Sequence, residues 1–264
     1  MRMALTAAAV VLVLVLLCVD WRGGGSSALN VIGSTSVQPF AEMLAQEFND
    51  QTTDFVVDVQ GGGSTAGLQA AANGVADIGM CSRSLKEGEE FTAIPIARDG
   101  LAIVVHPSNP LLALTRPQIR KIFAGELTNW NQVGGDNRPI RLITREEGSG
   151  TREAFTKLVM GNSRISRKAL TQESNGSVKE LVRYDPAAIA YMSLGLVGAE
   201  LKALHVDGFA PTAAEVTANR YPLVRPFLFV TQGPPTPKAQ RFIDFVLSPH
   251  AQRLLEKEGL VPIK

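Results

Sequence analysis

Cysteine and histidine are scarce in this chain of 264 residues, which holds two cysteines and three histidines. No two of them have the spacing of metal ligands, so we expect no structural zinc site. Cys18 lies in a hydrophobic leader, which leaves Cys81 without a partner and argues against a disulfide-stapled fold. The sequence therefore predicts neither a metal site nor a cofactor.

An excess of one charge is also lacking. The 26 lysine and arginine residues nearly balance 25 aspartate and glutamate residues, for a formal net charge of +1. This balance does not favour a nucleic-acid-binding surface. The 24 glycines and 15 prolines are too few for low-complexity disorder, and 45% of the residues are hydrophobic, enough for a core. The length favours one large domain or two modest ones.

The first 28 residues have the features of an export signal. Residues 4–19 are almost continuously apolar and follow a single basic residue, Arg2. A run of this length is short for a membrane-spanning helix and typical of a signal-peptide core. Cleavage after Ala28 fits the preference for small residues at such sites. We expect residues 1–28 to be a signal peptide or N-terminal anchor, and the protein to be periplasmic or otherwise extracytoplasmic. Cleavage, lipid attachment and retention as a membrane anchor all stay open.

Beyond the leader, short apolar segments alternate with amphipathic helical patterns, which indicates an α/β fold. Two apolar runs, residues 101–105 and 223–230, are interpreted as strands that cross between two lobes. The predicted architecture is therefore two-lobed, with these crossover strands as its hinge and a ligand cleft between the lobes. We expect residues 29–105 with 222–264 in the first lobe and residues 106–221 in the second.

Three turns between a predicted strand and a predicted helix are rich in glycine and hydroxyl groups: residues 33–36, 63–65 and 148–151. Glycine lets the backbone approach a ligand closely, and a hydroxyl at a helix start lies beside outward-pointing N–H groups. In an open α/β sheet such turns lie at the carboxyl ends of strands, where ligands bind. Each turn alone could be an ordinary helix cap. All three, with Arg145 before the third, favour a shared oxyanion site.

Several motifs, in order along the chain, resemble those of the periplasmic phosphate-binding proteins of ABC importers. They are residues 33–36, 61–67, 76–79 with Ser82 and Arg83, and 145–152. The resemblance extends over residues 29–264 and implies a type II periplasmic-binding-protein fold that holds one phosphate between its lobes. It also implies delivery of phosphate to the transmembrane permease subunits of an importer. We expect a monomer, with no nucleic-acid partner and no enzymatic activity.

Matched residue by residue, the resemblance also implies a phosphate site. Hydroxyl and backbone N–H groups at the three turns would bind the phosphate oxygens, and Arg145 would supply positive charge. The implied ligand-binding residues are Thr35, Ser36, Ser64, Ser82, Arg83, Arg145, Ser149, Gly150 and Thr151.

One position departs from the family pattern. The best-known members have an aspartate after the serine of the third strand's turn, and that aspartate accepts a hydrogen bond from the phosphate proton. Here Arg83 follows Ser82, so the proton acceptor is unassigned. Asp77, Glu146 and Glu147 are candidates, and each could equally be a solvated charge.

Two alternative functions stay open. A binding protein for another oxyanion, sulfate or molybdate, would use the same anion-binding turns, and so would a phosphate sensor with no role in transport. An enzyme is not favoured, because the stretch around Ser149 lacks the Gly-x-Ser-x-Gly pattern of a nucleophile elbow. Each of the three histidines is interpreted as a surface or helix-end residue.

Overall fold

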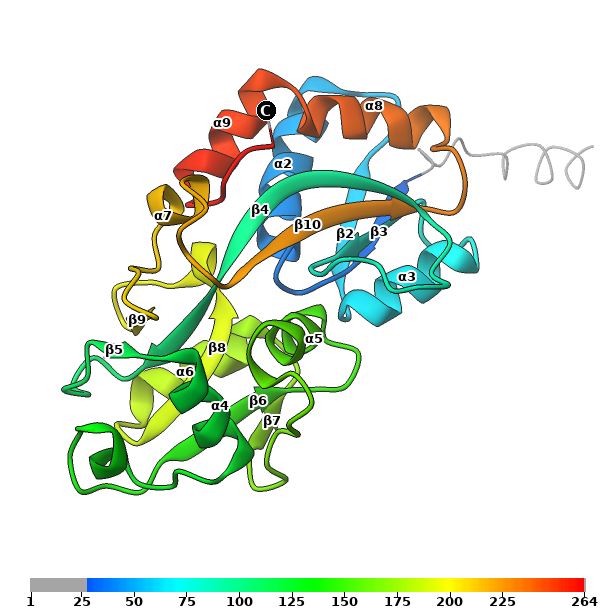
Figure 1. The fold of residues 1–264 in the computed structure, drawn as a ribbon. Helices are drawn as coiled ribbons and strands as arrows, with labels where there is room; N and C mark the ends of the chain where they lie inside the picture. The colour runs from blue at the N-terminus through cyan, green and yellow to red at the C-terminus, as the bar shows by residue number, and fades with distance from the viewer. Residues whose placement is uncertain (1–27, 264) are drawn as a thin grey trace, which may run out of the picture.

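Two lobes joined by a pair of long strands make up the protein (Figure 1). The computed structural model describes residues 28–263, so the predicted leader, up to residue 27, lies outside the described residues. The connecting strands are β4 (Thr92–Val105) and β10 (Val224–Thr231), which pair antiparallel. The two-lobed α/β fold with two crossover strands, predicted from the sequence, is confirmed.

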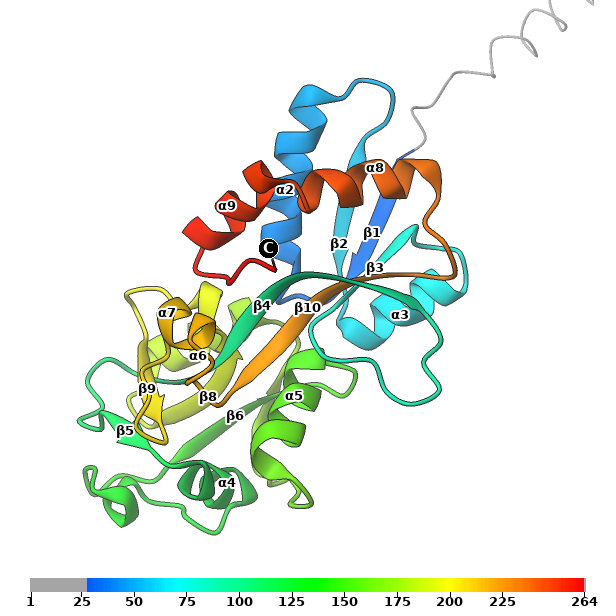
Figure 2. The same ribbon diagram turned by 45° about the horizontal axis from the view of Figure 1, so that its top comes forward.

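Three parallel strands form the framework of the first lobe. β1 lies between β2 and β3, and β3 pairs with β10. Helices α2, α8 and α9 pack on one face of these strands, and α3 packs on the other (Figures 1 and 2). The bounds are β1 Leu29–Gly33, α2 Gln38–Gln51, β2 Val57–Gly61, α3 Ser64–Ala72, β3 Ile78–Cys81, α8 Pro237–Val246 and α9 Pro249–Lys257.

The second lobe continues the same sheet beyond β4, in the order β4-β8-β6-β7. Strand β6 is parallel to both β7 and β8, while β9 pairs with β4 and β5. The strands are β5 Ala113–Leu114, β6 Arg141–Arg145, β7 Leu170–Gln172, β8 Ala188–Ser193 and β9 Lys202–Val206. The helices are α4 Arg116–Ala124, α5 Gly150–Phe155, α6 Asn175–Tyr184 and α7 Ala213–Thr217, with shorter helical turns at Trp130–Val133, Thr156–Met160 and Leu194–Leu196. Within residues 28–263, no helix combines the length and apolarity that crossing a membrane requires.

The crossover strand β4 contributes to the cores of both lobes. Ile96 and Ala97 pack in the apolar cluster under α2 and α8, whereas Leu101 and Ile103 pack in the cluster of the second lobe. The change of core therefore occurs around residue 100, where β4 also begins to pair with β8. The predicted division of the chain into lobes at residues 105 and 222 stays a prediction.

The structure extends the predicted strand 101–105 and adds elements that the sequence does not predict. β4 begins at Thr92, because its first half pairs along the whole of β10. Strands β7 and β9 and helix α6 are further additions. Of these, α6 bears directly on function, since it begins at Asn175 in the region where the predicted turns meet.

Gly67 lets helix α3 pack directly on the backbone of the parallel strands. A Cβ atom there would lie 2.6 Å from the carbonyl oxygen of Ile32 and 2.8 Å from the Cα of Gly33. We predict that Gly67→Ala destabilises the fold by about 1–3 kcal/mol, because neither backbone atom can move without disturbing β1. Urea denaturation measures the change. Gly176→Ala in α6, where the nearest atom is 3.6 Å away, is the matched control and should leave stability unchanged or raise it. Equal midpoints for the two variants would contradict this packing.

Candidate functional site

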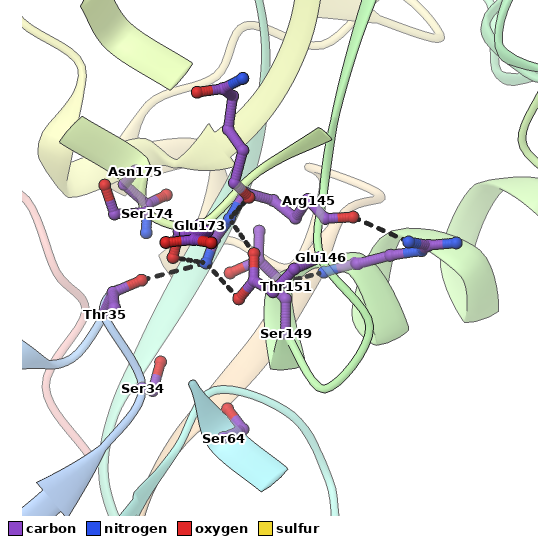
Figure 3. A network of polar contacts seen from close by, with 12 residues as sticks. Ser34, Thr35, Ser64, Arg145, Glu146, Ser149, Thr151, Glu173, Ser174 and Asn175 are labelled. Carbon is purple, nitrogen blue, oxygen red and sulfur yellow. Dashed lines mark hydrogen bonds and ion pairs between the residues drawn. The ribbon is translucent and has the colours of Figure 1, made fainter. Parts of the chain in front are cut away.

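The three predicted turns meet between the lobes, as Figure 3 shows. Residues 34–36 follow β1, Ser64 follows β2, and residues 146–151 follow β6. β1 and β2 are parallel neighbours, so their carboxyl ends lie at one edge of the sheet, facing the turn that follows β6. Ser82, at the end of β3, lies beside Ser64 with its backbone N–H donating to Ser64 Oγ (3.0 Å).

Hydrogen bonds connect the turns of one lobe to those of the other. Ser36 Oγ and Thr151 Oγ1 are 2.7 Å apart, and Arg145 Nη2 donates to Thr35 Oγ1 (3.1 Å). The backbone N–H of Thr65 donates to the carbonyl oxygen of Gly148 (3.1 Å). Both hydroxyl groups of the first pair are almost completely buried. The lobes are therefore in contact, and the hydroxyl groups form one cluster between them.

Gly150 is required for this close approach. A Cβ atom at Gly150 would lie 2.2 Å from Ser64 Oγ and 2.7 Å from Ser82 Oγ. The first backbone turn of α5 therefore faces the start of α3 with no side chain between them. N–H groups at a helix start have no partner within the helix, so the starts of α3 and α5 bring two sets of such donors close together. Of these, the Thr65 N–H already donates to Gly148 and the Arg152 N–H to Ser149.

Arg145 provides a buried positive charge at the cluster. Its side chain is 1% exposed, and its Nε and Nη2 each donate to the Glu146 carboxylate at 2.9 Å. Nε and Nη2 also donate to the carbonyl oxygens of Gln172 and Glu173. Nη1 has no hydrogen-bond partner. In residues 28–263, three other buried side-chain atoms share that condition, but each lies within 3.0 Å of an oppositely charged atom. An unused buried N–H on a guanidinium is what an anion would take up.

A closed ring of polar contacts, not predicted from the sequence, supports the cluster. Arg225 Nη1 donates to Thr151 Oγ1 (2.7 Å), and its Nε donates to Asp99 Oδ2 (2.9 Å). Ser193 Oγ donates to Asp99 Oδ1 (2.9 Å), and the Ser193 N–H donates to Asn175 Oδ1 (3.3 Å). Asn175 Nδ2 then donates to Ser36 Oγ (2.8 Å), which completes the ring through Thr151.

The Asp99–Arg225 pair within this ring is almost fully buried. Burial opposes both charges, raising the pKa of Asp99 and lowering that of Arg225, while each group stabilises the charge of the other. The sequence carried one signal for this pair: Arg225 is a charged residue inside an apolar run interpreted as a buried strand. A buried charge requires a partner, and the partner lies opposite on β4.

Ser149 has a local role as well as a place in the cluster. Its side-chain oxygen accepts a hydrogen bond from the backbone N–H of Arg152 (3.3 Å), which caps α5. The guanidinium of Arg152 in turn donates to the carbonyl oxygen of Arg145 (2.8 Å). Because the cap uses only a lone pair of Ser149, its hydroxyl proton stays free for a ligand.

Arg83 is the exception among the predicted site residues. Its guanidinium donates to both oxygens of Glu89 (2.7 and 2.8 Å), and its Nε lies 3.0 Å from the Glu153 carboxylate of α5. Lys86 pairs with the same Glu153. Two carboxylates thus hold the Arg83 guanidinium, for which the resemblance implies a contact with the anion, and they make Arg83 a link between the lobes. The geometry therefore does not support a ligand contact by this side chain.

The three candidate proton acceptors have different surroundings. Asp77 accepts from the backbone N–H of Asn30 (2.8 Å), near the amino ends of β1 and β3 and away from the turns. The Glu147 side chain is 93% exposed. Glu146 lies in the cluster, with both carboxylate oxygens bound to Arg145. In the described part of the chain, no group of three or more His, Cys, Asp or Glu residues could hold a metal ion.

Comparison with known proteins gives consistent matches. The family model described as "PBP superfamily domain" matches residues 22–250. The phosphate-binding protein PstS of Bacillus subtilis is 30% identical over 245 residues, which cover 90% of this chain and 81% of that protein.

Two solved structures are similar over nearly the whole fold. One is a phosphate ABC transporter substrate-binding protein from Clostridium perfringens with bound phosphate, with a TM-score of 0.87 and 36% identity over 90% of this chain and 100% of that one. The other is an ABC-type phosphate transport receptor from Vibrio cholerae, with a TM-score of 0.75 and 38% identity over 88% of this chain and 99% of that one.

The buried ion pair generates a stability prediction. Arg225→Met leaves Asp99 buried without its cation, and we predict a loss of about 3–5 kcal/mol in the free energy of unfolding. Urea denaturation measures it. Removing Asp99 as well, in Arg225→Met with Asp99→Leu, should recover part of the loss, because no unpaired charge is left buried. Arg220→Met, which breaks the exposed pair with Glu215, is the control and should hardly change the midpoint. A small effect of Arg225→Met would mean that Asp99 is neutral or hydrated.

The Arg83–Glu89 contact generates a prediction about pH. The hydrogen bonds from Arg83 hold the pKa of Glu89 below its ordinary value of 4.5. A carboxyl whose pKa is lower in the folded state stabilises the fold above that value, and this stabilisation is lost as the pH falls. We therefore expect Glu89→Gln to be less stable than the parent at about pH 7 and the difference to shrink as the pH falls below 4.5. Denaturation across this range, with the exposed Glu90→Gln as control for charge, tests it. A pH-independent difference would contradict the assignment.

Proposed function

Since the chain belongs to the PBP (periplasmic-binding-protein) superfamily and, within it, to the phosphate-binding proteins, we propose that it binds inorganic phosphate between its lobes and delivers it to an ABC importer. It is a binding protein and not an enzyme. The observation that carries the proposal is the Arg145 guanidinium, buried among hydroxyl groups from both lobes with Nη1 unused.

The proposed ligand groups can replace the water around a small dianion. Removing that water is costly, so many donors must converge on the oxygens. The site offers the hydroxyl cluster, the backbone N–H groups at the starts of α3 and α5, and Arg145 Nη1. Charge-assisted hydrogen bonds contribute roughly 1.5–3 kcal/mol each, and a dissociation constant of about 1 μM requires only about −8 kcal/mol net. The proposed ligand residues are Thr35, Ser36, Ser64, Ser82, Arg145, Ser149, Gly150 and Thr151.

Arg83 is also one of the ligand residues that the resemblance implies, but we propose a different role for it. Its contact with Glu153 joins the loop after β3 to α5, and it forms only when the lobes meet. Arg83 therefore supports closure around the ligand, while Arg145 supplies the charge that faces it.

The cellular context follows the family. Proteins of this kind are extracytoplasmic. We propose that this one is exported by its N-terminal signal, acts as a monomer, and docks on the transmembrane permease subunits of the importer.

Calorimetry of the ligand-stripped protein tests the function. We expect tight binding of phosphate and a loss of at least about 100-fold in Arg145→Gln, because the only buried cation with an unused donor is removed from the described site. Arg116→Gln, which changes an exposed arginine paired with Asp207, should bind as the parent does. If the parent protein bound sulfate or molybdate in preference to phosphate, the proposed ligand would be wrong.

A further inference from the structure

A phosphate site must also accommodate the proton that monohydrogen phosphate keeps near neutral pH. This question rests on the proposed function. Glu146 is bonded to Arg145 of the site, Asp99 belongs to the ring of polar contacts that supports it, and both oxygens of each carboxylate already accept hydrogen bonds. Asp99 is committed to Arg225 and Ser193, and Glu146 is committed to Arg145. A neutral acceptor would leave both of these pairings intact, whereas Glu146, whose oxygens keep further lone pairs, is the alternative acceptor.

The Ser36–Thr151 hydroxyl pair, with one member from each lobe, is held by donors whose direction is fixed. Arg225 Nη1 bonds Thr151 Oγ1, and a guanidinium can only donate. Asn175 Nδ2 bonds Ser36 Oγ. The Asn175 amide cannot be turned around, because its Oδ1 accepts from the backbone N–H of Ser193, which is itself only a donor. Each hydroxyl oxygen therefore uses one lone pair to accept a hydrogen bond from a group that can only donate, Asn175 Nδ2 for Ser36 and Arg225 Nη1 for Thr151.

Either hydroxyl can be the donor in the bond between Ser36 and Thr151. The number of protons and lone pairs left over on the pair is the same in both cases. A hydroxyl has one proton and two lone pairs. The 2.7 Å bond between Ser36 and Thr151 consumes one proton and one further lone pair. What remains is one proton on one oxygen and one lone pair on the other. The pair can therefore offer a ligand one donor and one acceptor, and it cannot offer two donors.

We propose that the Ser36–Thr151 hydroxyl pair accepts the proton of bound monohydrogen phosphate and thereby selects phosphate against sulfate. One hydroxyl donates to a phosphate oxygen, and the other accepts the phosphate O–H through its remaining lone pair. Sulfate has no proton to give, so that lone pair faces an oxygen lone pair of the sulfate. A neutral acceptor thus selects phosphate against sulfate without placing a carboxylate charge beside the phosphate dianion.

The test is the ratio of sulfate to phosphate dissociation constants, with sulfate measured by competition against bound phosphate. In Thr151→Val, Arg225 Nη1 loses its acceptor and becomes a second donor towards the anion. In Ser36→Ala, Asn175 Nδ2 does the same. We expect the ratio to fall by about tenfold or more in both variants. Thr151→Ser, which keeps the hydroxyl, should retain the parent ratio.

A further variant is expected to move the ratio in the opposite direction. Asn175→Ala removes the donor to Ser36 and leaves a second lone pair free on the hydroxyl pair. Sulfate should then bind more weakly relative to phosphate, so the ratio should rise. If Thr151→Val or Ser36→Ala stays folded but binds neither anion, no ratio can be measured for it, and the ratio in Asn175→Ala then tests the proposal. An unchanged or lower ratio in Asn175→Ala would overturn the proposal.

The alternative acceptor, Glu146, is tested in the same assay. Glu146→Gln should weaken or strengthen both anions together, with the ratio unchanged. A ratio that collapses in Glu146→Gln and not in Thr151→Val would assign the proton to Glu146 and refute the hydroxyl pair. Failure of the parent protein to bind phosphate would instead refute the proposed function. Normal phosphate binding with unmoved ratios refutes only the inference.

Discussion

The buried ion pair between Asp99 and Arg225 lies where the two crossover strands are adjacent, and it holds Thr151 of the proposed anion site. The two residues are direct partners in the β4–β10 ladder. From this position Arg225 reaches Thr151 of the second lobe and the carbonyl oxygen of Ser82 in the first. Asp99 orients Arg225 on one side and bonds Ser193 on the other. The strands that join the lobes thus also fix the hydroxyl groups that we propose as ligand contacts.

Such a pair is a poor source of stability, because taking two charges out of water costs as much as their attraction returns. The ion pair instead fixes the orientation of the groups hydrogen-bonded to it. Every contact in the ring except the one between Ser36 and Thr151 has a donor or an acceptor that cannot exchange roles, so the positions of the Ser36 and Thr151 protons are restricted. An apolar pair at the same place could hold the strands together equally well, but it would leave Thr151 free to turn. The Asp99–Arg225 pair therefore serves to orient the neutral hydroxyl groups of Ser36 and Thr151 rather than to add stability.

The local part of this site could be read from the sequence, and the tertiary part could not. Glycine followed by Ser or Thr between a strand and a helix defines a turn within a few residues, so the turns of β1, β2 and β6 were predictable. α6 was not, because its buried face holds mainly Val178 and Val182 among charged neighbours. Arg83 shows the limit most clearly. The family resemblance implied an anion contact for it, but Glu89 and Glu153 lie near it only in the folded chain.

The proposed site couples closure of the lobes to binding of the anion through Arg145. The lobes are held together by Ser36 with Thr151, Arg145 with Thr35, and Arg83 with Glu153. Closing them without a ligand leaves Arg145 Nη1 buried and unsatisfied, which costs about 1–3 kcal/mol or more for a charged group. An anion bound at Nη1 would remove that cost, and Thr35 of the other lobe already contacts the same guanidinium through Nη2. A ligand shifts an equilibrium by its difference in affinity for the two states, and in the proposed site the unsatisfied guanidinium nitrogen adds to that difference. The contacts between the lobes offset part of the free-energy cost of closure, and bound anion makes the closed form the more stable one.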